Sequence, residues 1–338
     1  MAVEHRVAVL GGGSFGTAIA NLVAANNSSV ILWMRDPENA ERCLQTRENS
    51  LYLPGVTLNS HLEITADLAT ALTGADIVFF SVPSKAYRPL ARQSSQYLAG
   101  HTLVISAAKG IESETCKLMT EILHEELPKT RIGLISGPNL AREIAQQQIT
   151  ATVVASKDSE LCSEIQHLLS CPYFRVYASH DPFGVELAGT LKNIYAIIAG
   201  IAAAMNMGQN TISVLITRSL AEMSRYAAKL GANPMTFLGL GGVGDLFVSC
   251  TSPLSRNYQI GYALGQGLTL EQAIEQVGQV AEGVNTTRII KARAEQLGIY
   301  MPLVNALYNT MFEGKSIKAV LHDLMLAEQT NDVEFIAG

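Results

Sequence analysis

The 338-residue sequence contains few charged and few aromatic residues. Charged residues make up 16% of the chain and aromatic residues 6%, whereas apolar residues reach 48%. This composition indicates a globular protein with deep burial, as in a parallel sheet that is covered on both faces. The formal net charge of -6 argues against a surface for nucleic acid or an anionic membrane. It leaves room for a local basic pocket that binds a small phosphate ligand.

Cysteine is scarce and shows no pairing pattern. The five cysteines are Cys43, Cys116, Cys162, Cys171 and Cys250. Their number is odd, none lies in a CxxC pattern, and none has histidines at metal-binding spacing. We therefore expect no metal site, no catalytic cysteine and a reducing cytoplasmic compartment.

Long hydrophobic runs are missing as well. His5 and Arg6 are followed by only four apolar residues, Val7–Leu10, which is too short for a secretory signal. The longest apolar run, Ile194–Met205, is about half of what a membrane helix needs. We expect it to form a buried core helix, and we expect no membrane embedding.

The first half of the chain alternates between strand-like and helix-like segments. Segments such as Lys85–Leu98, Ser113–Leu127 and Ser159–Leu169 have helical composition and lie between apolar runs of strand length. This rhythm predicts parallel βαβ units. The strand-like runs are Arg6–Leu10, Val30–Met34, Ile77–Val82, Thr102–Ser106, Arg131–Ser136, Thr150–Ala155 and Phe174–Tyr177.

The second half is predicted to be helical throughout. From Asp181 onward no convincing strand occurs, and long Ala-, Leu-, Ile- and Met-rich patterns such as Pro182–Met205 and Thr211–Leu230 dominate. We therefore predict an α/β Rossmann domain with a mostly parallel, doubly wound sheet over residues 1–180, and an all-α substrate and catalytic domain over residues 181–338. A cleft between two such domains is the usual place for a ligand.

A glycine-rich motif follows the first predicted strand. Gly11, Gly13 and Gly16 fit the G-x-G-x-x-G fingerprint, and the βαβ unit around them has the expected length of about 30 residues. The first glycine permits the tight turn, the second lets backbone N–H groups approach a pyrophosphate, and the third permits close helix packing. The motif predicts a bound nicotinamide dinucleotide at a helix N-terminus.

The position after the second strand distinguishes the two nicotinamide cofactors. An acidic residue there binds the ribose 2′-hydroxyl of NAD, but this chain has Arg35 followed by Asp36. Arg35 is suited to the 2′-phosphate of NADP. The alternative is a solvent-facing arginine paired with Asp36 or Glu38. We expect NADP or NAD, with NADP favoured.

Further polar residues occur where ligands of a parallel sheet bind and in the helical half. Lys109 follows the strand Thr102–Ser106, and the Gly137-Pro138-Asn139 segment follows Arg131–Ser136. Lys192 and Asn193 enter the apolar helix, where an unpaired lysine is costly unless it is functional. The nineteen residues from Gly239 to Asn257 combine glycines, Asp245, hydroxyls and Arg256, which indicates a phosphate-binding loop.

These segments resemble the NAD(P)-dependent glycerol-3-phosphate dehydrogenases of the bacterial type. The resemblance covers nearly the whole chain in the family's order, and the GDLFVSCTSPLSRN segment is the most specific part. Two positions depart from the family pattern: Asn139 replaces a Ser or Thr, and Val243 replaces a Leu. The matching segments are GGGSFG (11–16), AAKGIE (107–112), SGPNLAREIA (136–145), ELAGTLKNIYAI (186–197), GDLFVSCTSPLSRN (244–257) and AEGVNTTR (281–288).

The resemblance implies reversible hydride transfer between the nicotinamide and C2 of glycerol 3-phosphate, giving dihydroxyacetone phosphate. It also implies a supply of glycerol 3-phosphate for phospholipid synthesis and a homodimer. Lys192 is the implied acid/base, Asp245 and Asn193 hold it and the substrate, and Lys109 assists. The implied substrate contacts are Lys109, Gly137, Asn139, Lys192, Asp245, Ser255, Arg256 and Asn257. The implied cofactor contacts are Gly11, Gly13, Ser14, Phe15, Gly16, Arg35, Lys109, Ala141, Arg256, Val280 and Glu282.

The residues alone leave two other functions possible. A β-hydroxyacid-type dehydrogenase shares the two-domain plan, and its substrate carboxylate would bind Arg256. A catalytically inactive dinucleotide sensor would keep the glycine loop and lose its lysines. The presence of Lys109 and Lys192 speaks against the sensor, and Ser255-Arg256-Asn257 favours a phosphate over a carboxylate.

Overall fold

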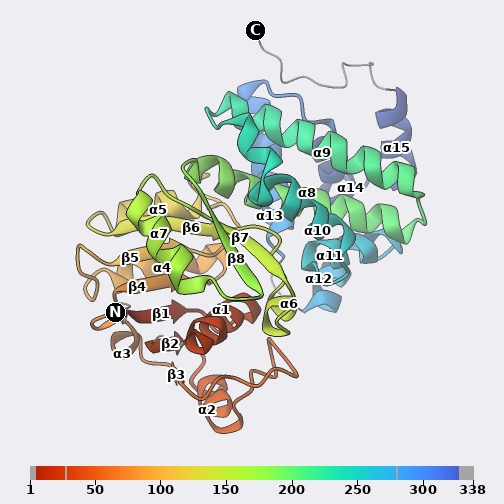
Figure 1. Ribbon diagram of the computed structural model, residues 1–338. Coiled ribbons are helices and arrows are strands. Elements are labelled where there is room, and N and C mark those ends of the chain that lie inside the picture. Colours follow the sequence, from red (N-terminus) through yellow and green to blue (C-terminus); the bar gives the residue numbers. More distant parts are fainter. Residues whose placement is uncertain (1–4, 27–28, 279–280, 327–338) are drawn as a thin grey trace. The chain divides into compact units, whose positions relative to one another are not determined.

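The computed structural model describes residues 5–26, 29–278 and 281–326. The chain divides into two compact units (Figure 1). The first unit comprises the chain up to Pro182 except Ser113–Cys116, and the second comprises that short segment and the chain from Phe183 onward.

An eight-stranded sheet forms the centre of the first unit, in the order β3-β2-β1-β4-β5-β6-β7-β8. Neighbouring strands are parallel except β6 and β7, which are antiparallel. This confirms the predicted mostly parallel Rossmann sheet. The strands are β1 (Arg6–Leu10), β2 (Ser29–Trp33), β3 (Leu62–Thr65), β4 (Ile77–Phe80), β5 (Leu103–Ser106), β6 (Arg131–Ser136), β7 (Thr150–Ala155) and β8 (Phe174–Ser179).

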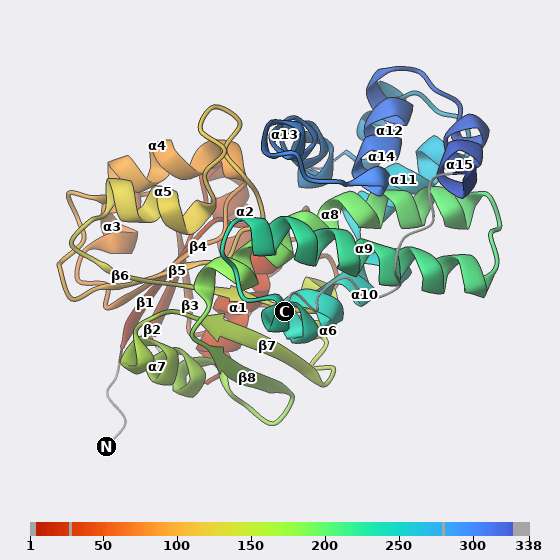
Figure 2. The ribbon, with the colours of Figure 1, turned by 90° about the horizontal axis from the view of Figure 1, so that it is seen from above.

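Helices cover both faces of this sheet because alternate strand residues are apolar on both sides. In β1, Val7 and Val9 pack into one buried cluster with α1, α2 and α7, whereas Ala8 and Leu10 pack into another with α3, α4 and α5 (Figure 2). The helices are α1 (Ser14–Ala25), α2 (Pro37–Thr46), α3 (Leu68–Leu72), α4 (Ser84–Ser94), α5 (Met119–Glu126), α6 (Ala141–Ala145) and α7 (Ser159–Leu169).

The structure differs from the sequence-based prediction in several elements of the first unit. Strand β3 and the short helices α2, α3 and α6 were not predicted. The helix predicted over Ser113–Leu127 is confined to Met119–Glu126, and the residues before it form turns and a bridge between Ile111 and Leu118. Cys116 has φ of 57° there, a left-handed conformation that interrupts a right-handed helix.

The described part of the second unit contains helices and no strand, as predicted. Its central element is α8 (Pro182–Ala204), which is buried on all sides along most of its length. The others are α9 (Gln209–Lys229), the 3₁₀ helix η1 (Pro234–Leu238), the π-helix η2 (Leu240–Gly244), α10 (Asp245–Thr251), α11 (Arg256–Gly265), α12 (Leu270–Val277), α13 (Glu282–Leu297), α14 (Pro302–Phe312) and α15 (Ile317–Leu326).

Glycines bring α8 and α11 into close contact. A Cβ atom on Gly261 of α11 would lie 1.8 Å from the carbonyl oxygen of Ile197, and one on Gly200 of α8 would lie 2.0 Å from that of Tyr258. Only glycine fits at these two positions without moving a backbone. This close crossing brings the polar end of α8 near the first residues of α11.

Helix α8 is also the one described helix that is long and apolar enough to cross a membrane by length and composition. However, 83% of its most apolar window is buried inside the protein, as in the core helix of a globular domain. The prediction of a buried core helix over this segment is confirmed.

Candidate functional site

The glycine loop joins β1 to α1 and is shaped by contacts that exclude side chains. Gly11 has φ of +123°, and a Cβ atom there would lie 2.3 Å from the carbonyl oxygen of Ser81. A Cβ atom on Gly16 would lie 2.0 Å from the carbonyl oxygen of Gly11, whereas one on Gly13 meets nothing within 4 Å. The backbone at Gly13 is therefore open to an approaching ligand.

Helix α1 presents a favourable N-terminus to an anion. Its N-cap is Gly13, which offers no capping side chain, and its first turn contains no acidic residue. Free N–H groups and the helix dipole at such an end attract a pyrophosphate. These features fit a dinucleotide held by Gly13, Ser14 and Phe15, and the Ser14 hydroxyl donates a 2.6 Å hydrogen bond to the carbonyl oxygen of Tyr52.

Arg35 lies just beyond β2 with an exposed side chain. Asp36 does not pair with it in the described structure, because its carboxylate caps α2 and accepts a 3.1 Å hydrogen bond from the N–H of Glu38. The arginine therefore remains suited to an external anion, which supports the reading of this position as a contact to the 2′-phosphate.

Three of the predicted substrate contacts lie together after β5 and β6. The Lys109 ammonium donates a 3.1 Å hydrogen bond to the carbonyl oxygen of Gly137. The Asn139 amide donates at 2.7 Å to the Thr152 hydroxyl, which in turn donates to the carbonyl oxygen of Ser136 at 2.8 Å. The Asn139 side chain is thus held from the β7 side, a role that the sequence did not predict.

The segment that carries Lys109 is anchored by an ion pair. Glu112 accepts two hydrogen bonds from Arg88 of α4, at 2.8 and 2.7 Å. Arg88 also contacts Glu125 and Glu126 of α5, both at 2.8 Å. Hydrogen bonds from Arg92 and then Arg88 lower the pKa of Glu126 to about 2. The bidentate Arg88–Glu112 pair fixes the position of Glu112 in addition to balancing its charge.

Lys192 enters α8 with a buried ammonium group. It forms an ion pair with Asp245, the first residue of α10, and donates a 2.5 Å hydrogen bond to the hydroxyl of Ser249 one turn later. The three residues are 7%, 1% and 4% exposed. Burial of this order requires a paired charge, and the pair holds the Lys192 amine in one orientation.

Asn193 and Asn257 link three helices next to this ion pair. The Asn257 amide donates to the Asn193 side-chain oxygen at 3.0 Å and accepts from the N–H of Gly283 at 3.0 Å. A Cβ atom on Gly283 would lie 2.7 Å from the Asn257 oxygen, so α13 meets α11 through a glycine. Asn193 therefore contacts Asn257 rather than Lys192.

The remaining predicted residues lie at helix N-termini. Ser255 caps α11 by accepting a 3.4 Å hydrogen bond from the N–H of Tyr258, and Arg256 is the first residue of that helix. Ala141 begins α6 and Glu282 begins α13. Val280 lies outside the described residues. An arginine at the N-terminus of a ten-residue helix is well placed for a phosphate.

Cysteine and metal chemistry have no support in the described residues. Cys250 lies near Lys192 and Asp245, but burial raises the pKa of its thiol to about 12, so no thiolate forms near neutral pH. Among the described side chains, no group of three or more His, Cys, Asp or Glu could hold a metal ion.

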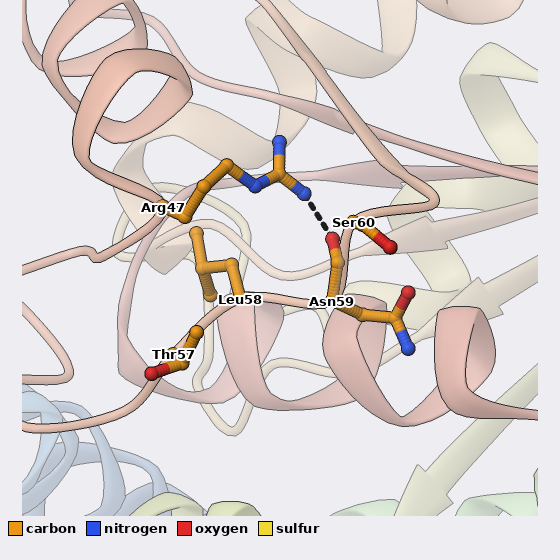
Figure 3. Close-up of a pocket in the computed structure, with 5 residues that line it drawn as sticks. All are labelled: Arg47, Thr57, Leu58, Asn59 and Ser60. Carbon is orange, nitrogen blue, oxygen red and sulfur yellow. Dashed lines mark hydrogen bonds between the residues drawn. The ribbon is translucent and has the colours of Figure 1, made fainter.

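A separate pocket of about 500 Å³ lies on the first unit, lined by Arg47, Thr57, Leu58, Asn59 and Ser60. In Figure 3 the Arg47 guanidinium reaches the carbonyl oxygen of Asn59, and it donates another hydrogen bond to that of Leu62 at 3.0 Å. None of the predicted site residues lines this pocket, and its arginine is used to hold the chain between α2 and β3.

Sequence reasoning gave no role to two residues that hold these groups in place, Ser249 and Asn49. Ser249 lies four residues after Asp245 on a helix, so the i,i+4 spacing could have identified it. Asn49 belongs to no recognised motif, and only the structure brings it to the glycine loop.

Both halves of the chain match sequence profiles of one family. Residues 6–162 match the N-terminus of NAD-dependent glycerol-3-phosphate dehydrogenase, and residues 181–322 match its C-terminus. Relatives named NAD(P)+ glycerol-3-phosphate dehydrogenase include those of Pseudomonas fluorescens (strain SBW25) and Azotobacter vinelandii (strain DJ). Each is 56% identical over 337 residues, covering 100% of this chain and 98% or 99% of the relative.

A solved structure agrees with these matches. Glycerol-3-phosphate dehydrogenase from Coxiella burnetii superposes with a TM-score of 0.92 at 33% sequence identity, covering 96% of this chain and 99% of that one. The two profile matches include the glycine loop, Lys192, Asp245 and the start of α11. The chain belongs to the NAD-dependent glycerol-3-phosphate dehydrogenase family.

Proposed function

We propose that this protein interconverts sn-glycerol 3-phosphate and dihydroxyacetone phosphate, using NADP or NAD with a preference for NADP. The relatives' names supply the reaction. The observation that carries it to this chain is the buried Lys192–Asp245 ion pair, next in sequence to Asn193 and linked through Asn257 to the start of α11. A proton-transfer group and a phosphate site thereby belong to one cluster of side chains.

The proposal assigns the dinucleotide to residues 1–180 and the proton transfer to residues 181–338. Gly11, Gly13, Ser14, Phe15 and Gly16 would hold the pyrophosphate region, and the open backbone at Gly13 fits that group. The other cofactor contacts we assign are Arg35, Lys109, Ala141, Arg256, Val280 and Glu282. A bound nicotinamide supplies or accepts the hydride.

Lys192 moves the proton at the C2 oxygen of the substrate. In the reducing direction the carbonyl carbon receives a hydride and the oxygen receives a proton from the Lys192 ammonium; oxidation reverses both transfers. Asp245 and Ser249 hold the amine in place, so it does not have to be ordered when the reaction occurs. Lys109 supplies a further cation to the substrate.

Arg256 and the N-terminus of α11 bind the phosphate group. The guanidinium and the first N–H groups of a helix both favour a phosphate dianion. Ser255 and Asn257 hold this end of the helix through their cap and cross-helix hydrogen bonds. Gly137 and Asn139, held by Lys109 and Thr152, complete the substrate contacts that we assign.

A spectrophotometric assay tests this function. NADPH or NADH oxidation is followed with dihydroxyacetone phosphate, with unphosphorylated dihydroxyacetone, and with keto acids. We expect kcat/KM for dihydroxyacetone to be at least about a hundredfold lower, because a charge-assisted phosphate contact contributes a few kcal/mol. Equal values for the two compounds would contradict the phosphate site, and faster turnover of a keto acid would favour a β-hydroxyacid dehydrogenase.

Location and assembly follow from the same proposal. We propose that the enzyme works in the cytoplasm as a homodimer and supplies glycerol 3-phosphate for phospholipid synthesis. The unpaired cysteines among the described residues support a reducing compartment. Size-exclusion chromatography with light scattering measures the assembly directly.

A further inference from the structure

Asn49 connects the chain after α2 to the glycine loop. Its side chain is fully buried, with 0% exposure. The side-chain amide donates hydrogen bonds to the carbonyl oxygen of Gly12 at 2.8 Å and to the hydroxyl of Thr17 at 2.9 Å. One buried amide thus holds the loop and the first turn of α1 together.

The contact to Gly12 fixes the direction of a neighbouring donor. In a trans peptide the carbonyl of one residue and the N–H of the next point in opposite directions. Because the Gly12 carbonyl points to Asn49, the Gly13 N–H points away from Asn49. Gly13 is also where the loop is open, since a Cβ atom there would meet nothing within 4 Å.

Asn49 is itself held firmly. The backbone carbonyl oxygen of Asn49 accepts hydrogen bonds from the N–H groups of Tyr52 at 3.2 Å and Leu53 at 2.7 Å, which closes a turn. Ser14 ties the same turn to α1 through the carbonyl oxygen of Tyr52. The side chain therefore reaches the loop from a rigid support rather than from a free segment.

We propose that Asn49 is a positioning residue for the dinucleotide: it orients the Gly12–Gly13 peptide so that the Gly13 N–H is aimed at the pyrophosphate before the cofactor binds. The inference rests on the proposed function, because it needs a dinucleotide at this loop. A preoriented donor avoids the cost of ordering the loop on binding, so loss of Asn49 weakens cofactor affinity. It leaves the proton-transfer group Lys192 untouched.

The test compares Asn49→Leu with a matched control, Asn21→Leu. Asn21 lies on α1 and also bonds the chain after α2, accepting a 2.6 Å hydrogen bond from the N–H of Asn59, but it makes no bond to the glycine loop. NADPH affinity is measured by fluorescence titration without substrate, and Tm and kcat at saturating NADPH are measured on the same samples. Asn49→Asp, which keeps the shape and loses both donated bonds, is a second variant in case the leucine variant does not fold.

We expect Kd for NADPH to rise about tenfold or more in both Asn49 variants, with kcat at saturation within about twofold of wild type. Asn21→Leu should lower Tm and leave Kd within about twofold. An unchanged Kd in a folded Asn49 variant, or an equal rise in Asn21→Leu, overturns the proposal. Wild-type protein that binds neither NADPH nor NADH would overturn the proposed function as well, so the two failures are distinguishable.

Discussion

Lys192 has two roles in this account. Its buried ion pair with Asp245 stabilises the fold, and its amine transfers a proton to or from the substrate. Removing Lys192 takes away the ammonium that balances the charge of the buried Asp245 carboxylate, and breaking a buried ion pair in this way destabilises a protein by about 3–5 kcal/mol. A loss of activity in a single variant therefore does not separate chemistry from folding. The Asp245 carboxylate must be neutralised in the same experiment.

We expect Lys192→Met to lower kcat by about 10² to 10⁴, the usual range for one general acid–base group. The double variant Lys192→Met with Asp245→Asn removes both buried charges, so it should regain thermal stability without regaining activity. Lys192→Arg should also stay inactive, because a guanidinium stays protonated near neutral pH and cannot act as a general acid or base. Stopped-flow kcat and melting curves on the three proteins check this; a kcat within about threefold of wild type in Lys192→Met would remove the lysine from the chemistry.

Arg35 offers a second residue-scale prediction, on cofactor choice. Its side chain is exposed and forms no ion pair with Asp36 or Glu38 in the described structure. Arg35→Asp places a carboxylate next to the expected 2′-phosphate, so KM for NADPH should rise by at least about tenfold more than KM for NADH. If both KM values move together, Arg35 does not recognise the 2′-phosphate.

At the scale of elements, the segments that follow β5 and β6 carry Lys109, Gly137 and Asn139, which lie outside the strands themselves. Lys109 lies in an irregular segment, and Glu112 near its end is held by Arg88 of α4. The Arg88 side chain is 21% exposed and that of Glu112 is 13% exposed, so solvent screens this pair only in part. We infer that α4 restrains the segment on which Lys109 depends.

This restraint predicts different outcomes for two arginines of α4. Arg88→Met removes the two hydrogen bonds that Glu112 accepts from Arg88, so KM for dihydroxyacetone phosphate should rise by about tenfold through misplacement of Lys109. Arg92→Met is the matched control, because Arg92 contacts Glu126 and not Glu112. Steady-state kinetics on both variants test this prediction. If Arg88→Met and Arg92→Met have equal KM values for dihydroxyacetone phosphate, the Arg88–Glu112 ion pair is only structural.

The elements also show where sequence reasoning works and where it fails. Seven strands were predicted because each is an apolar run of β-branched residues between helical segments. Strand β3 lies at the sheet edge, and its four residues, Leu62–Thr65, alternate apolar and polar side chains instead of forming an apolar run. Helices α2 and α3 are short, yet Asp36 and Asp67 cap them, so their N-terminal signals were present in the sequence.

The candidate site was predictable only as far as motifs extend. The glycine loop, Lys109, Lys192, Asp245 and Arg256 belong to recognisable segments. The partners within each cluster are distant in sequence: Asp245 is 53 residues from Lys192, and Asn49 is 37 residues from Gly12. Such pairings depend on how helices and loops pack, and no local pattern encodes them.

For the whole molecule, stability should depend on pH through one buried carboxyl group. Glu222 accepts hydrogen bonds from the N–H groups of Leu303 and Val304 and from Tyr195, and burial raises its pKa to about 7. A raised carboxyl pKa means that its contribution to stability is complete below its unfolded pKa near 4.5 and is lost as pH rises through about 7.

Glu222→Gln removes this titration and so tests its sign. The difference in Tm, variant minus wild type, should increase by a few degrees between pH 5 and pH 8, because only the wild type must bury a charge at the higher pH. Differential scanning fluorimetry across that range measures it. A difference that stays constant with pH would mean that Glu222 does not change ionisation there.

The central claim is that this chain transfers a hydride between a nicotinamide dinucleotide and C2 of a three-carbon phosphate, with Lys192 moving the proton. The most direct test uses NADPH deuterated at the transferable C4 position together with dihydroxyacetone phosphate, and analyses the product by mass spectrometry and NMR. We predict sn-glycerol 3-phosphate with one deuterium at C2 from the wild-type protein, and formation at least about a hundredfold slower from Lys192→Met. Product without deuterium at C2, or no glycerol 3-phosphate from folded wild-type protein with either NADPH or NADH, would contradict the account.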